Sequence, residues 1–503
     1  RYYMITFIIG LVILFGGGYL YSKHCEKVFG PDDRETPAIA MQDGVDYVPM
    51  KMWKNSLINL LNIAGTGPVL GPIQGILFGP LAFITIPVGN VLAGAMHDYF
   101  IGMVSLRNKG AQMPLLVKKY LGNTSKSVYN VIVVVLMLLV GSVFIYTPGD
   151  LIVTELIGQV ADKSNPTVWI VYGAIFVYYL IATLFPIDKI IGRIYPAFGL
   201  FLVLSAVGIF IGIIFEPHLL DNLTFGEGFG VHQLNGAPLI PAFFVTVACG
   251  ILSGFHATQV TMISRSVTSE REARMTFYNM MIVEGFIAMC WAAGAMILFN
   301  SGTATDTGAT LMVGLISRKF LGNFLGAIAV LGVIVLPITS GDTALRSVRL
   351  ILAEQLGIDQ ANKAKRIGLT TVIFIPVMLI LLWAKFNPAG FNLLWQYFAF
   401  TNQFIAIFAL SIITVYLNIH GKPGYIALIP GMFYSFVVMS FIFNAKIGFN
   451  LDKLLGLADG SYMASYVAAA IFTAAYAYLT VNRAKKHGMS IEDHDVYEGV
   501  KRK

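Results

Sequence analysis

Residues 62–72 read NIAGTGPVLGP, and they interrupt an apolar run that extends from about residue 55 to residue 78. Three glycines in this stretch add backbone freedom, and Pro68 and Pro72 lack the N–H that a regular helix needs. Backbone broken at membrane depth is tolerated only where it is buried in protein or lines a wet cavity. A packing face of small residues is the alternative interpretation, but two closely spaced prolines favour a true helix break.

Composition places this break in a membrane protein. Of the 503 residues, 56% are hydrophobic and 12% are charged, which leaves too little polar surface for a soluble chain of this size. Apolar segments of about 20 residues recur along the sequence, and each is long enough to cross a hydrocarbon core of about 30 Å. The net charge of +7 does not indicate nucleic-acid binding, because the basic residues lie between the apolar runs. Three cysteines provide neither a disulfide framework nor a zinc-finger spacing.

Hydropathy predicts an all-α polytopic fold with thirteen transmembrane helices. With the N-terminus outside, 27 of the 34 lysines and arginines lie in inner loops, so the positive-inside rule places the C-terminus in the cytoplasm. The candidate spans are 2–21, 55–78, 80–105, 128–149, 166–185, 191–215, 240–262, 276–299, 324–345, 367–384, 391–416, 424–444 and 463–482.

Ten of these spans form two blocks of five, and an odd number of helices per block turns the second block upside-down. The first helix of each block is the one interrupted by glycine and polar residues, which is the sequence signature of a transporter with a central site. We therefore expect a 5+5 inverted-repeat, LeuT-like core with one extra N-terminal helix and two C-terminal ones. The expected divisions are 1–22 (N-terminal helix), 23–54 (cytoplasmic loop), 55–215 and 240–416 (repeats), 424–482 (peripheral helices) and 483–503 (cytoplasmic tail).

The second interruption reads ILSGFHATQ, at residues 251–259. Its histidine is either a satisfied core residue or a functional one, and its place at the head of the second block favours function. We interpret Ser253 and Gly254 as the break, and His256 and Gln259 as side chains that meet substrate or protons. N–H groups freed at a half-helix start can hold a carboxylate. The predicted substrate-binding residues are Gly65, Thr66, Gly67, Gln74, Ser253, His256, Gln259, Asn402 and Gln403, the last two being equally able to tie helices together.

Ion coupling is predicted in the run PITSGDTALRS, at residues 337–347. Its hydroxyl and carboxylate oxygens suit Na⁺, and Asp342 suits a proton. Asp342 and Arg346 are four residues apart and can pair on one helical face; Arg346 can also stand in for a coupling cation. The predicted coupling residues are Thr339, Ser340, Asp342, Thr343, Arg346 and, in another span, Asp98, with Glu284 as a secondary proton carrier.

Together, IAGTGPVLGPIQG (63–75), HDYF (97–100), SGFHATQ (253–259), PITSGDTALRS (337–347) and FAFTNQ (398–403) resemble the carbon starvation protein A (CstA) family. The resemblance implies a transporter rather than an enzyme, with the fold of the amino acid–polyamine–organocation group. It also implies uptake of peptides or pyruvate across the bacterial inner membrane under carbon limitation. Asp342 and its neighbours would lie where related transporters bind Na⁺, and His256 would face substrate. After HATQ this sequence continues VTMISR, which departs from the family pattern.

A different class of function is a metal-binding intramembrane enzyme or sensor that uses His97, Asp98 and His256. These groups suit Zn²⁺, although His97 and Asp98 are adjacent and would point about 100° apart on a helix. A structural metal at His97 and His256 is a further alternative. The expected partners are thus a small carboxylate or peptide substrate, the lipid bilayer and a coupling H⁺ or Na⁺. No nucleic acid is expected, and the substrate, the coupling ion and the oligomeric state stay open.

Overall fold

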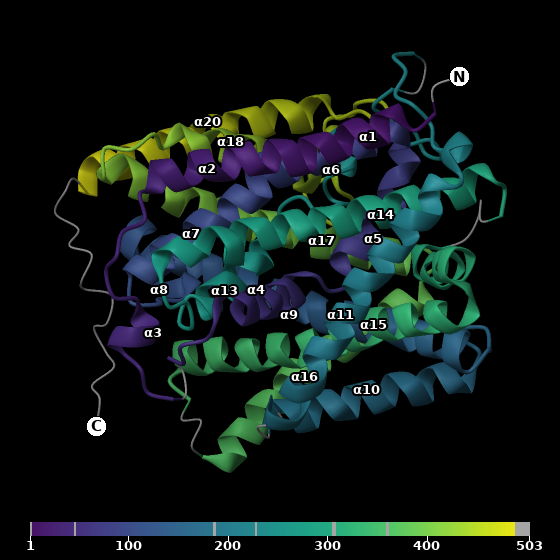
Figure 1. The fold of residues 1–503 in the computed structure, drawn as a ribbon, viewed down its shortest axis with the longest axis horizontal. Helices are drawn as coiled ribbons and strands as arrows, with labels where there is room; N and C mark the ends of the chain where they lie inside the picture. The colour runs from purple at the N-terminus through teal and green to yellow at the C-terminus, as the bar shows by residue number, and fades with distance from the viewer. Residues whose placement is uncertain are drawn as a thin grey trace.

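A computed structural model describes residues 3–44, 47–184, 188–226, 229–303, 308–358 and 362–487, and its long helices run side by side (Figure 1). Within these ranges nine helices are long and apolar enough to cross a membrane, and two shorter apolar helices cover 166–182 and 199–214. The helices α1, α2, α18 and α20 lie along one edge of the view, and α10 and α16 lie along the other. The all-helical polytopic prediction is confirmed, whereas the count of thirteen spans and the domain divisions stay predictions.

The first half of the chain supplies the helices up to α11. In chain order they are α1 (Ile5–Val12), η1 (Ile13–Gly17), α2 (Gly18–Phe29), α3 (Pro37–Ala40), α4 (Met52–Ile63), α5 (Gly67–Gly75), η2 (Ile76–Leu81), α6 (Ala82–Gly89), η3 (Asn90–Gly94), α7 (Ala95–Arg107), α8 (Met113–Leu121), α9 (Asn123–Leu151), η4 (Ile152–Leu156), α10 (Pro166–Leu184) and α11 (Asp188–Ile214).

The second half continues to residue 487, beyond which the predicted tail lies outside the described residues. Its helices are η5 (Pro217–Leu219), α12 (Leu239–Ala242), α13 (Gly254–Ile263), η6 (Glu270–Glu272), η7 (Arg274–Asn279), α14 (Met280–Asn300), α15 (Ala309–Leu356), α16 (Lys363–Phe386), α17 (Gly390–Ile419), α18 (Tyr425–Asn444), α19 (Leu451–Leu454) and α20 (Met463–His487).

The predicted break in the first span is present, because α4 ends at Ile63 and α5 begins at Gly67. Pro68 occupies the first turn of α5, where its missing N–H leaves no helical bond unmade. A Cβ atom on Gly67 would lie 2.3 Å from the Sγ of Cys249, in the second broken span. Since carbon contacts optimally at about 3.5–4.0 Å, only glycine lets the two interrupted helices approach this closely.

The second break is longer than the predicted pair Ser253–Gly254, since residues 243–253 separate α12 from α13. Buried side chains satisfy carbonyl groups of this unwound segment. The amide of Asn90 donates to the carbonyl of Gly250 at 2.8 Å and to that of Met281 at 2.9 Å. The indole of Trp395 donates to the carbonyl of Thr246 at 2.8 Å. The unwound backbone is therefore buried in protein and hydrogen-bonded, as an apolar environment requires.

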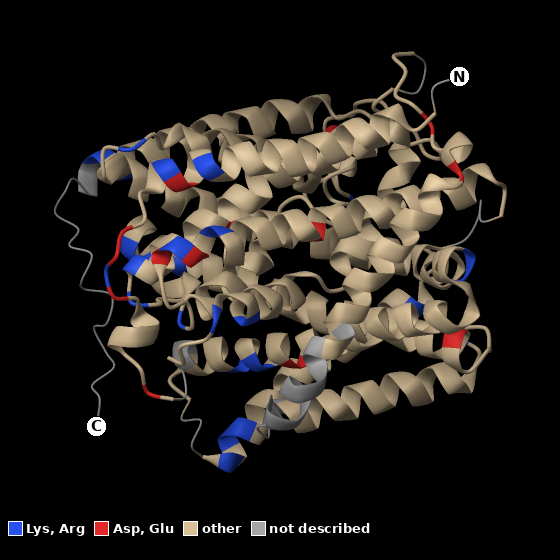
Figure 2. Ribbon diagram, viewed as in Figure 1, with Lys and Arg blue, Asp and Glu red and all other residues tan. Residues whose placement is uncertain are grey.

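Lysine and arginine gather at the end of the bundle where α2 and α20 end, which we call the basic end (Figure 2). There the buried carboxylate of Glu270 accepts hydrogen bonds from the Arg107 guanidinium, at 2.8 Å from Nε and 2.8 Å from Nη2. It also accepts the backbone N–H of Asp32 at 2.9 Å. This pairing ties the segment after α2 to the end of α7 and to η6.

An ion pair between α9 and α16 is buried. Lys385 Nζ lies 2.8 Å from each carboxylate oxygen of Asp150 and donates to the carbonyl of Ala161 at 2.9 Å. The hydroxyl of Tyr172 donates to Asp150 at 2.5 Å, and the ammonium lies 4.7 Å from the ring centre of Tyr146. Every polar group of the pair is thus satisfied, which is the condition for burying charge in an apolar setting.

Candidate functional site

A small cavity of about 20 Å³ lies between the two helix breaks. The space between the two breaks therefore holds about one water molecule in this conformation. Its lining joins both breaks to α9, α15 and α17, and it comprises Asn62, Ile63, Gly65, Gly67, Val140, Phe144, Cys249, Phe255, Ser340, Phe398 and Asn402.

Asn402 closes the amino end of α13. Its Oδ1 accepts hydrogen bonds from the Ser253 hydroxyl at 2.9 Å and from the backbone N–H of Phe255 at 3.2 Å. The adjacent Gln403 donates from Nε2 to the carbonyl of Phe244 at 2.5 Å. Both amides therefore bind the region of the second break in this conformation. Asn402 occupies the backbone N–H of Phe255, which is one of the groups that the sequence predicts to hold a substrate carboxylate.

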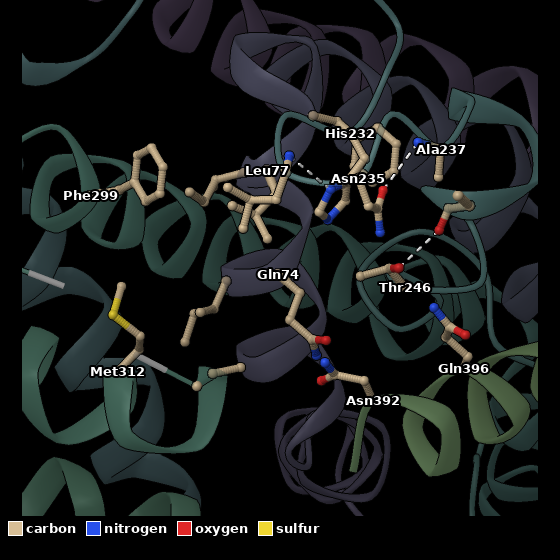
Figure 3. A pocket seen from close by; sticks show the side chains of 17 residues that line it. Gln74, Leu77, His232, Asn235, Ala237, Thr246, Phe299, Met312, Asn392 and Gln396 are labelled. Carbon is tan, nitrogen blue, oxygen red and sulfur yellow. Dashed lines mark hydrogen bonds between the residues drawn. The ribbon is translucent and has the colours of Figure 1, made fainter. Parts of the chain in front are cut away.

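A second cavity, of about 440 Å³, lies where α14 ends and α15 begins (Figure 3), at the end of the bundle opposite the basic end (Figure 1). Its polar side chains come from α5, the 232–237 loop, the unwound segment and α17, and Figure 3 shows the amide of Gln74 directed toward Asn392. Burial lowers the pKa of His232, which favours its neutral form. Among the described residues that line the cavity, none is Asp, Glu, Lys or Arg; the polar ones are Gln74, His232, Asn235, Thr246, Asn392 and Gln396.

The histidines and acids that the sequence singled out form one fully buried cluster. Asp98 Oδ1 lies 2.7 Å from His97 Nδ1, and Asp98 Oδ2 lies 3.3 Å from His256 Nδ1. The expectation that His97 and Asp98 point apart is wrong, because the carboxylate turns back to the imidazole beside it. On the other side of the His256 ring, Nε2 lies 3.6 Å from Oε1 of Glu284, on α14.

Five of the predicted coupling residues lie on α15, and two of these five contact α10; the sixth, Asp98, lies on α7. Asp342 accepts hydrogen bonds from the Tyr178 hydroxyl on α10 at 2.8 Å and from the Thr343 hydroxyl at 3.1 Å. The Thr339 hydroxyl donates to the carbonyl of Leu336 within its own helix, at 2.8 Å. Arg346 donates to the carbonyl of Ala182, also on α10, at 2.9 Å.

Two further residues that the sequence predicts to bind substrate, Thr66 and Gln259, make no hydrogen bond to another helix among those described. The Thr66 hydroxyl is buried at the first break and has no hydrogen-bond partner among the described residues. Gln259 is buried on α13 and donates to the neighbouring Thr258 hydroxyl at 3.2 Å. The breaks, the small cavity and the buried cluster thus adjoin one another, and the larger cavity contacts them through Gln74 and Thr246.

The family model described as carbon starvation protein CstA matches residues 2–161, 146–305 and 294–441. The chain belongs to the CstA family. An uncharacterized membrane protein of Haemophilus influenzae is 38% identical over 344 residues, which cover 60% of this chain and 93% of that protein.

Relatives with named activities are more distant. The peptide transporter CstA of Escherichia coli is 26% identical, over 83% of this chain and 78% of its own length. The pyruvate/proton symporter BtsT of the same species is 26% identical, over 53% of this chain and 45% of its own length. A crystal structure of an Eremococcus coleocola manganese transporter, in complex with an aromatic bis-isothiourea substituted compound, shares the fold. Its TM-score is 0.56 at 13% identity, over 89% of this chain and 99% of that one.

Several residues at the site escaped the sequence interpretation. Cys249 counted only as a cysteine within an apolar run, although it sits at the contact between the breaks. Asn90 has a visible signal, since it is a lone amide in the apolar run that leads to His97. Tyr178 and Trp395 carry no such signal, because aromatic residues are common in membrane helices.

Proposed function

We propose that this member of the CstA family is an ion-coupled importer of short peptides, with pyruvate as the competing candidate substrate. The larger cavity carries the proposal. Its volume of about 440 Å³ falls within the range of about 300–1,000 Å³ typical of sites that enclose organic ligands. Pyruvate, with three oxygens and one methyl group, would fill only part of this space.

The chemistry of the cavity suits a peptide. Side-chain amides from Gln74, Asn392 and Gln396 offer both donors and acceptors, which match the N–H and C=O groups of a peptide backbone. Phe78, Phe299 and Met312 add apolar surface for substrate side chains. A peptide carboxylate would then be held farther in, at the helix breaks.

In our proposal the carboxylate replaces the Asn402 amide at the start of α13. A carboxylate oxygen accepts the same hydrogen bonds from Ser253 and Phe255, and its charge interacts more favourably with the helix N-terminus. The other contacts assigned to substrate are Gly65, Thr66, Gly67, His256, Gln259 and Gln403, which lie around the breaks. Substrate would enter at the larger cavity and leave at the basic end, which the positive-inside rule assigns to the cytoplasm.

Coupling is assigned to α15. Asp342 is buried, its oxygens are already oriented by Tyr178 and Thr343, and Ser340 on the same helix lines the small cavity. A proton or Na⁺ bound at Asp342 would therefore sense whether the centre is occupied. The proposal also includes a LeuT-like core of five plus five helices, three additional helices that bring the total to thirteen, and a location in the inner membrane.

Uptake by purified protein in liposomes tests the proposal. Labelled dialanine and labelled pyruvate are offered under an inward proton gradient, under a Na⁺ gradient and without either. We expect gradient-dependent uptake of the dipeptide, loss of that dependence in Asp342→Asn, and weaker uptake by Gln396→Ala. Gln42→Ala, an exposed amide at the basic end, is the matched control. Uptake of pyruvate alone would overturn the peptide assignment, and absence of uptake and counterflow for both substrates would overturn the transporter.

A further inference from the structure

A set of metal-binding side chains lies directly behind the helix breaks. The Sγ of Cys249, one ring nitrogen of His256 and one carboxylate oxygen of Glu284 all lie within 4.8 Å of one another. Cys249 belongs to the unwound segment, His256 to α13 and Glu284 to α14, and all three are buried. The set therefore joins the broken helix to its neighbour.

Two of these side chains present atoms without hydrogen-bond partners. Neither carboxylate oxygen of Glu284 has one, and neither does Nε2 of His256, within the part of the chain that the structure describes. Both side chains are fully buried, at 0% exposure. A buried carboxylate that accepts no hydrogen bond costs several kcal/mol in effective terms, and a cation bound between Glu284 and His256 would offset that cost.

The spacing of these atoms fits a small divalent ion. His256 Nε2 and Glu284 Oε1 are 3.6 Å apart. Tetrahedral Zn²⁺ with nitrogen and oxygen ligands at about 2.0–2.2 Å places those ligand atoms about 3.4 Å apart. Only a small adjustment of side chains would be needed for these two donors, and Cys249 approaches the same point from the unwound segment.

Asp98 stands behind the imidazole. Its Oδ2 lies 3.3 Å from Nδ1 of His256, on the ring edge away from Glu284, and its Oδ1 contacts His97. The contact is within ion-pair distance, but neither atom has a hydrogen-bond partner among the described residues. A small rotation of the ring would let Nδ1–H donate to this carboxylate and leave Nε2 free to coordinate. Asp98 is thus a positioning residue, and His97 contacts this carboxylate instead of belonging to the set of three donors.

We propose that Cys249, His256 and Glu284 bind a resident divalent ion of the Zn²⁺ class. One thiolate, one imidazole and one carboxylate are ligands suited to zinc, whereas Mg²⁺, Ca²⁺ and Na⁺ prefer oxygen. The thiolate and the carboxylate neutralise the two charges of the ion, and binding releases the thiol proton to solvent. Cys249 also lines the small cavity, which is large enough for about one water molecule.

Cobalt(II) binding to the purified full-length protein tests this site, because a thiolate ligand gives cobalt a charge-transfer absorption band. We expect one Co²⁺ per chain, with that band, and displacement by an equal amount of Zn²⁺ but not by Mg²⁺. Cys249→Ser should abolish the band, and Glu284→Gln should weaken binding strongly. Asp98→Asn should weaken it about 10–100-fold while keeping the band, the usual effect of losing the group that orients a histidine ligand.

Cys290→Ser is the matched control, since Cys290 is also a free and buried cysteine but lies outside the cluster. Equal loss of the band in this variant would overturn the proposal. If the cluster variants fail to fold, the wild-type protein still decides: absence of the thiolate–cobalt band at saturating Co²⁺ overturns the site. Binding is measured without substrate, so this result is independent of the transport assay.

Discussion

The buried pair of Asp150 and Lys385 yields a quantitative prediction. In Lys385→Met the ammonium is lost together with its contacts at 2.8 Å to both oxygens of Asp150. The carboxylate then stays buried, with the Tyr172 hydroxyl as its remaining described donor. Breaking a buried pair by removing one partner costs about 3–5 kcal/mol. The double variant Asp150→Asn/Lys385→Met removes the uncompensated charge and should recover most of that loss.

Equilibrium unfolding in mixed detergent micelles, followed by tryptophan fluorescence, measures these differences. Trp169 stacks on Phe386 next to the pair, at 5.5 Å between ring centres, and gives a local signal. Lys319→Met is the matched control, because its pair with Glu216 is about 30% exposed and such pairs contribute about 0–1 kcal/mol. The reasoning is refuted if Lys385→Met costs no more than Lys319→Met, or if the double variant is no more stable than the single one.

Three other regions give predictions of the same kind. Asn90→Ala leaves the Gly250 carbonyl without its amide donor and should lower the unfolding free energy by about 1–3 kcal/mol, measured as above; an unchanged value contradicts the role of Asn90 in holding the unwound segment. Glu270→Gln weakens the contacts to Arg107 and Asp32, so limited proteolysis should cut the segment after α2 faster, whereas Asp33→Asn, in an exposed pair with Arg271, should not change the rate. Burial lowers the pKa of His232, so the folded loop favours the neutral imidazole. The stability from this neutral form is fully present above the unfolded-state pKa of about 6.5, and it is lost as the pH falls through the lower pKa of the folded state. In the wild type, hydrogen-exchange protection of residues 229–238 should therefore decrease as the pH falls, whereas in His232→Gln it should not depend on pH. The same pH dependence in both proteins would contradict this reasoning.

The sequence alone predicts the location of the breaks better than their extent. Prolines and glycines at 65–72 mark the first break to within a residue or two, because their effect is local. The second break begins ten residues before the predicted Ser253, at Phe243, in a run whose composition is simply apolar. It persists because Asn90, Trp395 and Gln403 satisfy its carbonyls from distant helices, and no local pattern contains such contacts.

The same limit applies to the buried cluster. His256, Asp98 and Glu284 were each visible as ionisable residues at membrane depth, which is where function is expected. Their convergence, and the place of Cys249 beside them, depend on how α7, α13 and α14 pack. Sequence can nominate such residues singly, but it cannot group them without the tertiary contacts.

The hydrogen bonds at Asn402 have a consequence for selectivity. The amide oxygen of Asn402 already accepts hydrogen bonds from Ser253 and Phe255 at the start of α13. The binding free energy of an arriving anion there is therefore only the difference between its own hydrogen bonds and those of Asn402 that it replaces. A neutral molecule with a single carbonyl gains almost nothing by this exchange, whereas a carboxylate gains the added charge interaction with the helix end. In the proposed transport cycle, Asn402 would therefore compete with every arriving solute, and a solute that binds no better than this side chain would not displace it.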